Sequence, residues 1–187
     1  MAQQQNGYAY VPHATYNEFR AYALTHGVNV DYAWGNQCWD ICAIVWYQYG
    51  LRLKTGPNHS VYECWTVSRM QNAVPPFSLV TRKEDIKRGD IVVFNRHGSY
   101  TTGHIGFADE DYRGTNYINI LGQNQGQGTS SGTPSDVRNS ALTYFLGAFR
   151  NANWIGSSPT PPTPTPTSGK KKRFPWVLYA NKLRQSR

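Results

Sequence analysis

The sequence predicts an α+β domain that is followed by a linker and a short C-terminal segment. Two helix-like segments come first, and after Gly89 the pattern changes to short apolar runs separated by glycines, which is typical of antiparallel strands. Helices first and strands afterwards indicate N-terminal helices packed on an antiparallel sheet. The Pro/Thr-rich stretch 157–169 favours an extended spacer. The predicted boundaries are therefore a domain at 1–156, a linker at 157–169 and a basic-aromatic tail at 170–187.

The helices are predicted from their capping and stop signals. Thr15 and Glu18 have the spacing of a capping box, and the helix that they begin is expected to run toward Gly27. A second, strongly apolar helix is expected from Cys38 to Gly50, and a weaker one at 61–71. Four strands are predicted in the runs DIVVFN, HIGFAD, NYINIL and YFLGAFR.

The basic charge belongs mainly to the tail. The chain has a formal net charge of +8, yet residues 170–187 contain seven basic residues and no acidic one, and the remainder has 12 basic against 11 acidic residues. This near-neutral body disfavours a nucleic-acid-binding protein. The tail could bind an anionic wall polymer, a membrane or a partner protein, or simply increase solubility. The N-terminus lacks a basic segment followed by an apolar stretch, so we expect no signal peptide.

Cys38 is the first candidate for chemistry. The chain has three cysteines, Cys38, Cys42 and Cys64, without a CxxC pair, which disfavours both a disulfide framework and a zinc site. Cys38 begins the apolar helix directly after a polar, glycine-containing loop. A helix N-terminus lowers the pKa of a thiol and offers backbone N–H groups to an oxyanion, so this position suits a nucleophile. The alternative is an ordinary buried thiol.

His104 is the candidate base for that thiol. Gly103 precedes it and the apolar strand IGFA follows, which places an imidazole at the start of a rigid strand, whereas the other histidines lie in loop-like or helix-end sequence. A third polar group should accept the second ring N–H. Asn124, just after the run NYINIL, could lie beside His104, although the string GQNQGQG could equally be a flexible polar loop.

Taken together, these motifs resemble a known family. QCWD at 37–40, RGDIVVF at 88–94, GHIGF at 103–107 and ILGQNQG at 120–126 are similar, in order and spacing, to CHAP (cysteine, histidine-dependent amidohydrolase/peptidase) domains over residues 14–150. The resemblance implies a papain-like α+β fold that cleaves peptidoglycan at N-acetylmuramoyl-L-alanine or within its peptides. It implies that Cys38 is the nucleophile, His104 its base and Asn124 the orienting residue. One departure is Gly122, where many members have a glutamate.

The resemblance also suggests how the site binds its substrate and a metal ion. Trp34, Gln37 and Tyr100 flank the motifs and are expected to contact substrate, although aromatic residues there could serve packing alone. The chemistry needs no cofactor. Some related domains bind calcium at positions that correspond here to Asn29, Asp31 and Asp40. The simpler interpretation is that Asp31 caps a turn and Asp40 stabilises the first turn of its helix.

The expected setting is that of a bacteriophage lysin. A catalytic domain with a spacer and without a signal peptide resembles an endolysin, which stays in the host cytoplasm until lysis, or a lysin carried on the virion tail. The tail at 170–187 would then dock on virion proteins or on an anionic wall or membrane. The alternative from another class is a non-catalytic wall-binding or virion structural module with the same fold.

Overall fold

The computed structural model describes residues 3–5, 8–10, 12–126 and 134–154, all of which belong to one compact unit, Met1–Ser157. The predicted linker at 157–169 and tail at 170–187 lie outside the described residues. Within the described ranges, no helix is long and apolar enough to cross a membrane.

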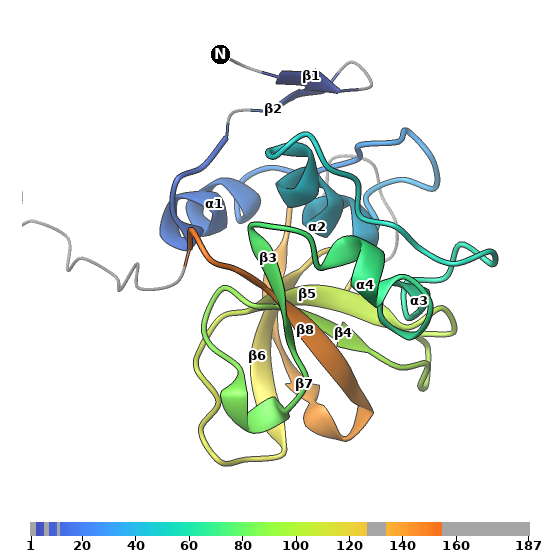
Figure 1. The fold of residues 1–187 in the computed structure, drawn as a ribbon, viewed down its shortest axis with the longest axis vertical. Helices are drawn as coiled ribbons and strands as arrows, with labels where there is room; N and C mark the ends of the chain where they lie inside the picture. The colour runs from blue at the N-terminus through green and yellow to red at the C-terminus, as the bar shows by residue number, and fades with distance from the viewer. Residues whose placement is uncertain (1–2, 6–7, 11, 127–133, 155–187) are drawn as a thin grey trace, which may run out of the picture. The chain divides into compact units, whose positions relative to one another are not determined.

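A six-stranded antiparallel sheet forms the centre of the fold, in the order β3-β8-β4-β5-β6-β7 (Figure 1). Its strands are β3 (Phe77–Val80), β4 (Ile91–Phe94), β5 (His104–Ala108), β6 (Tyr117–Gly122), β7 (Asp136–Ala141) and β8 (Phe145–Asn151). A separate two-stranded sheet pairs β1 (Gln3–Gln5) with β2 (Tyr8–Tyr10). The sheet confirms the four predicted strands.

The helices precede most of the sheet in sequence. They are α1 (Tyr16–Ala23), α2 (Cys38–Tyr47), α3 (Glu63–Thr66) and α4 (Arg69–Asn72), with 3₁₀ turns η1 (Lys83–Asp85) and η2 (Leu142–Tyr144). The predicted capping box is present, because the Thr15 hydroxyl accepts the Glu18 N–H at 3.2 Å and the Glu18 carboxylate accepts the Thr15 N–H at 3.3 Å. The single helix expected at 61–71 is instead two short helices. The break falls at Ser68, whose hydroxyl donates to the carbonyl of Thr55 at 2.8 Å.

The central strands are buried on both faces, which explains their continuous apolar runs. Ile91 and Val93 of β4 join the larger hydrophobic cluster, to which α1 and α2 contribute, whereas Val92 and Phe94 join a second cluster with Ile118 and Ile120. α2 packs against β5 and is buried along nearly its whole length. This packing fixes the helix N-terminus beside the first residue of β5.

Two strands of the six-stranded sheet, β7 and β3, were not predicted. β7 has the sequence DVRNSA, and its central residues are exposed, as suits the outer strand of a sheet; it therefore lacks an alternating apolar signal. β3, at the other edge, is only four residues long. Asp136, the first residue of β7, accepts hydrogen bonds from the side chain of Gln125, the residue that contacts His104.

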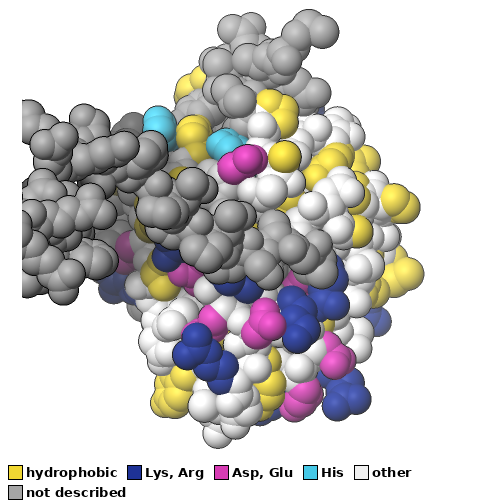
Figure 2. Space-filling model, turned by 90° about the vertical axis from the view of Figure 1, so that its left-hand side faces the viewer, with side chains coloured by type: hydrophobic (Ala, Val, Ile, Leu, Met, Phe, Trp, Pro, Cys, Tyr) yellow, Lys and Arg dark blue, Asp and Glu magenta, His cyan; other side chains and the backbone are white. Residues whose placement is uncertain are grey.

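Charged side chains on the described domain are mixed in sign. Figure 2 shows basic and acidic side chains interspersed over one face of the protein. Several form ion pairs, such as Arg20 with Asp109 at 2.7 Å and Arg150 with the buried Asp90 at 2.8 Å. The distribution agrees with the nearly neutral body calculated from the sequence.

Candidate active site

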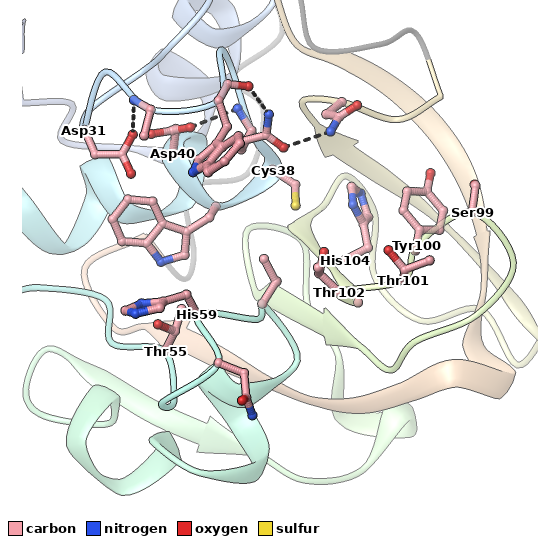
Figure 3. Close-up of a pocket in the computed structure, with 18 residues that line it drawn as sticks. Asp31, Cys38, Asp40, Thr55, His59, Ser99, Tyr100, Thr101, Thr102 and His104 are labelled. Carbon is pink, nitrogen blue, oxygen red and sulfur yellow. Dashed lines mark hydrogen bonds between the residues drawn. The ribbon is translucent and has the colours of Figure 1, made fainter.

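A pocket of about 680 Å³ lies at the N-terminus of α2. Its wall combines that helix end with the loops before α2, before α3 and before β5 (Figure 3). Of the nine residues singled out from the sequence, all but Asn29 line this pocket. The eight lining residues are Asp31, Trp34, Gln37, Cys38, Asp40, Tyr100, His104 and Asn124. The fold therefore brings the predicted residues together from segments far apart in the sequence.

Cys38 is the first residue of α2 and its side chain is almost wholly buried, with a relative exposure of 6%. The backbone before it is held by Asp40, whose carboxylate accepts the N–H groups of Gln37 and Val30, both at 2.9 Å. Asp40 thus stabilises the helix start, as the simpler interpretation of this residue expected. Backbone N–H groups in the first turn of a helix lack the usual intrahelical acceptor, and here those of Cys38 and Trp39 lie close enough to the Cys38 thiol to lower its pKa.

Burial favours the neutral form of the Cys38 thiol. Burial raises its pKa to about 11, and this effect exceeds the opposing backbone hydrogen bonds from Ile105 and Trp39. The backbone hydrogen bonds at the helix start lower this pKa, as expected, but burial outweighs them. The physical reason is that the helix end is packed against β5, so the thiolate loses more hydration than the helix N–H groups restore.

His104 begins β5 and faces Cys38 across the pocket (Figure 3). The ring is 2% exposed, and its Nδ1 has no hydrogen-bond partner within the part of the chain that the structure describes. Its Nε2 pairs with Oε1 of Gln125 at 3.2 Å. Burial lowers the pKa of His104 to about 4, although the hydrogen bond that the ring donates to Gln125 opposes this. The resting pair thus combines a neutral thiol and a neutral imidazole.

The glycines of the GHIG motif allow β5 to approach its neighbours closely. Gly103 has φ = +80°, and a Cβ there would lie 2.7 Å from the carbonyl oxygen of Phe94. At Gly106 a Cβ would lie 2.5 Å from Cγ2 of Ile120 and 2.8 Å from the carbonyl oxygen of Leu121. These contacts explain why glycines flank the short segment that carries His104.

Asn124 was expected to orient the His104 ring, but within the described residues it lines the same pocket without a hydrogen bond to that ring. It has φ = +53°, and its amide donates to Oε1 of Gln37 at 3.0 Å. The next residue, Gln125, supplies the partner of the ring instead. Gln123, 1% exposed, donates to the carbonyls of Val28 and Gln37 at 2.8 and 3.0 Å. The segment 123–125 is therefore a packed part of the site and not a flexible loop.

The other predicted substrate contacts lie around the opening of the pocket. Trp34 is 86% exposed, and Gln37 donates to its carbonyl. The Tyr100 ring lies over His104 with the ring centroids 4.6 Å apart. Trp34 therefore offers a solvent-facing aromatic surface, whereas Tyr100 forms part of the wall beside the imidazole.

The loop before α2 contains the candidate calcium ligands. Oδ1 of Asn29 is buried without a hydrogen-bond partner among the described residues, so it could serve as an oxygen ligand to a cation. Burial, with a smaller contribution from the nearby Asp31, raises the pKa of Asp40 to about 7, although backbone hydrogen bonds from Gln37 and Val30 oppose this. Among the residues that the structure describes, no three His, Cys, Asp or Glu side chains form a metal-binding group. A site here would thus need the Asn29 amide as its third side-chain ligand.

Comparisons with known proteins agree with this arrangement. The family model for the CHAP domain matches residues 27–124, just over half of the chain, and the chain belongs to this family. A search of curated proteins found no match. The crystal structure of a wild-type endolysin, LysIME-EF1, has the same fold: its TM-score is 0.59 at 21% sequence identity, and the match covers 76% of this chain and 66% of that one. The predicted α+β fold is confirmed.

Two crystal structures of Ly7917 are more distant. The structure of Ly7917 alone has a TM-score of 0.48, and the one with the hydrolysing product of MDP has 0.47, both at 16% identity and covering 60% of the Ly7917 chain. The chain thus spans slightly less than two thirds of the length of each of these neighbours.

Proposed function

We propose that this domain is a peptidoglycan hydrolase that cleaves an amide bond with Cys38 as nucleophile and His104 as base. The observation that carries the proposal is the juxtaposition of these two side chains in one pocket, at a helix N-terminus and a strand start (Figure 3). Membership of the CHAP family and the endolysin-like fold support the substrate class.

The mechanism begins from the neutral pair. The unprotonated Nδ1 of His104 accepts the thiol proton as Sγ of Cys38 attacks the carbonyl carbon of the substrate amide. The Cys38 backbone N–H stabilises the oxyanion. The imidazolium then protonates the leaving amine, and a thioester remains on Cys38. Water, deprotonated by His104, hydrolyses the thioester and regenerates the thiol.

The pH dependence follows from the two pKa values. The active form carries one proton on the pair, so it exists above the pKa of His104, about 4, and below that of Cys38, about 11. We expect kcat/KM on soluble wall fragments to be flat from about pH 5 to about pH 10 and to fall on both sides. An acid limb near about pH 6.5, the ordinary value for histidine, would contradict this account.

Substrate binding is assigned to the pocket opening. The exposed Trp34 can stack on a sugar or peptide plane, and the Gln37 side chain, held by Asn124, lies next to the nucleophile in sequence. Tyr100 limits the space beside His104. These contacts would place the scissile carbonyl over Cys38.

We also propose a structural calcium ion, held by Asn29, Asp31 and Asp40. Calcium would neutralise the two carboxylates, and these residues would then fix the loop before Cys38. Calcium is expected to raise the melting temperature of the wild type, with a stabilisation of about 2.7 kcal/mol at a hundredfold excess over Kd. Excess chelator should reverse this rise in melting temperature, and Asp31→Asn should make it smaller. Identical melting in calcium and in chelator, measured by calorimetry, would remove the ion from the account.

Purified cell walls test the proposed function. The protein should clear a suspension of walls from its target genus and release amino groups. A non-catalytic wall-binding module would instead sediment with walls of several Gram-positive genera without releasing product. That result would overturn the hydrolase proposal and favour the binding alternative.

The biological setting is proposed from the sequence and the family. The protein would act as a phage lysin, either at host lysis or from the virion, and residues 170–187 would serve as a docking or targeting peptide. Detection in purified particles distinguishes the two settings. Deleting 157–187 should leave hydrolysis of soluble muropeptides intact and reduce binding to walls, membranes or virion proteins if the tail has this role.

A further inference from the structure

We propose that Gln125 is the positioning residue for His104 and that Gly122 leaves the space in which its amide lies. The inference rests on the proposed function, since it concerns how the imidazole is held for proton transfer. The resemblance to the family implied that Asn124 orients His104. Here Gln125 is assigned that role, and Gly122, at the end of β6, makes it possible.

The orientation of the Gln125 amide is fixed by its surroundings. The side chain is 2% exposed, and its Nε2 donates to the carbonyl oxygens of Ile120 at 3.1 Å and Asp136 at 3.0 Å, and to Oδ1 of Asp136 at 3.0 Å. All of these partners are acceptors, so the NH₂ group must face them and Oε1 must face the ring. The amide therefore has one allowed orientation.

This orientation determines the tautomer of His104. Oε1 of Gln125 can only accept, so Nε2 of the neutral ring carries the proton and Nδ1 does not. Nδ1 is also the ring nitrogen without a partner in the described structure. The hydrogen bond thus leaves an unprotonated nitrogen available for the thiol of Cys38.

Gly122 makes room for the amide. A Cβ at this last residue of β6 would lie 3.2 Å from Cδ and 3.4 Å from Oε1 of Gln125. A side chain at 122 would therefore press on the amide of Gln125 and displace it by a few tenths of an ångström from its place beside the ring. Many members of the family have a glutamate at the position of Gly122. In this chain the polar group beside the ring is the amide of Gln125, three residues later.

Asp136 anchors the amide from β7. Its carboxylate accepts from Gln125 and pairs with Arg138 at 2.6 Å. The His104 ring thus contacts the neutral amide of Gln125, and the Asp136 carboxylate binds that amide instead of the ring. A carboxylate in direct contact would stabilise the imidazolium more strongly and raise the pKa of His104.

Four variants test the arrangement through kcat, KM and the pH profile on soluble wall fragments. Gln125→Ala should lower kcat about 10- to 100-fold and leave KM within about twofold. Gly122→Glu should also lower kcat, because its side chain meets the Gln125 amide. The double variant Gly122→Glu/Gln125→Ala should recover most of the lost kcat, with the acid limb moved to higher pH. Asn139→Ala, an exposed residue on the same strand as Asp136, is the matched control with unchanged kcat.

In the Gln125 variants the charged groups around His104 are unchanged, so the acid limb reports on the ring itself, whereas Gly122→Glu adds a carboxylate that should move the limb to higher pH. The titratable and charged groups around the ring are Cys38 from α2, His97 and Tyr100 from the loop before β5, and Asp136 and Arg138 from β7. A loss that reflected misfolding alone would lower the melting temperature and would not be recovered by the double variant. Gln125→Met fills the space without an acceptor and should lose kcat as Gln125→Ala does.

Nitrogen NMR of the His104 ring separates this inference from the proposed function. The wild type should show the Nε2–H tautomer, and Gln125→Ala a mixture of the two. If the wild type hydrolyses walls and Gln125→Ala keeps both its kcat and its tautomer, the inference is overturned and the hydrolase stands. If the tautomer shifts as expected and the wild type cleaves no wall, the inference about the ring stands and the hydrolase fails.

Discussion

Cys38→Ala is expected to reduce the hydrolysis of purified walls by at least about 10⁴-fold, because removal of the nucleophile leaves only binding and oxyanion stabilisation. The thiol is the only group at this position that can form the acyl intermediate. Its replacement by a smaller apolar residue leaves the start of α2 intact, since Asp40 and the backbone hold that start. The rate of amino-group release from walls measures the effect.

Cys64→Ala is the matched control for this result. Cys64 is also buried, but it lies in α3 and does not line the pocket. Its loss should lower the melting temperature modestly through the cavity it leaves, with hydrolysis retained at the temperature of the assay. Wall hydrolysis by Cys38→Ala at a rate close to that of the wild type would overturn the assignment of the nucleophile.

His104→Ala is expected to lower kcat/KM by about 10³- to 10⁴-fold near neutral pH, and the residual activity should rise with pH. Without the imidazole, attack requires a thiolate formed by loss of the proton to solvent. Because burial raises the pKa of Cys38 to about 11, the thiolate fraction increases about tenfold per pH unit up to that value. The wild type should show a flat profile over the same range.

The comparison requires pH–rate profiles of both proteins under matched conditions. His26→Ala is the control, since this histidine lies just after α1 and does not line the pocket. It should retain the rate and the profile of the wild type. A flat profile in His104→Ala would show that another group accepts the thiol proton, and the assigned base would be wrong.

Local signals predicted much of the fold. The capping box at Thr15, the apolar helix that begins at Cys38 and the continuous apolar run of β4 depend on neighbours in the sequence, and each is present. Cys38 and His104 were found for a similar reason. A helix start after a polar loop and a strand start after a glycine are both visible in the sequence.

The remaining features depend on contacts between distant segments. The choice of Gln125 over Asn124 follows from the positive φ of Asn124 and from acceptors on β6 and β7, and β7 itself has no apolar pattern. The sequence predicts the lowering effect of the helix start on the pKa of Cys38 but not the larger, opposite effect of burial, because packing against β5 is a tertiary contact. Neither the hydrogen bond of Gln125 nor the burial of Cys38 against β5 can be predicted from the local sequence pattern.

The central claim is that the Cys38–His104 pair hydrolyses an amide bond of peptidoglycan. Mass spectrometry of purified peptidoglycan digested in water enriched in heavy oxygen tests it most directly. We predict fragments with a new amino group and matching fragments with heavy oxygen in a new carboxyl group, and their masses identify the scissile bond. Heavy oxygen at a sugar reducing end, or an unchanged digest with the wild-type protein, would contradict the account.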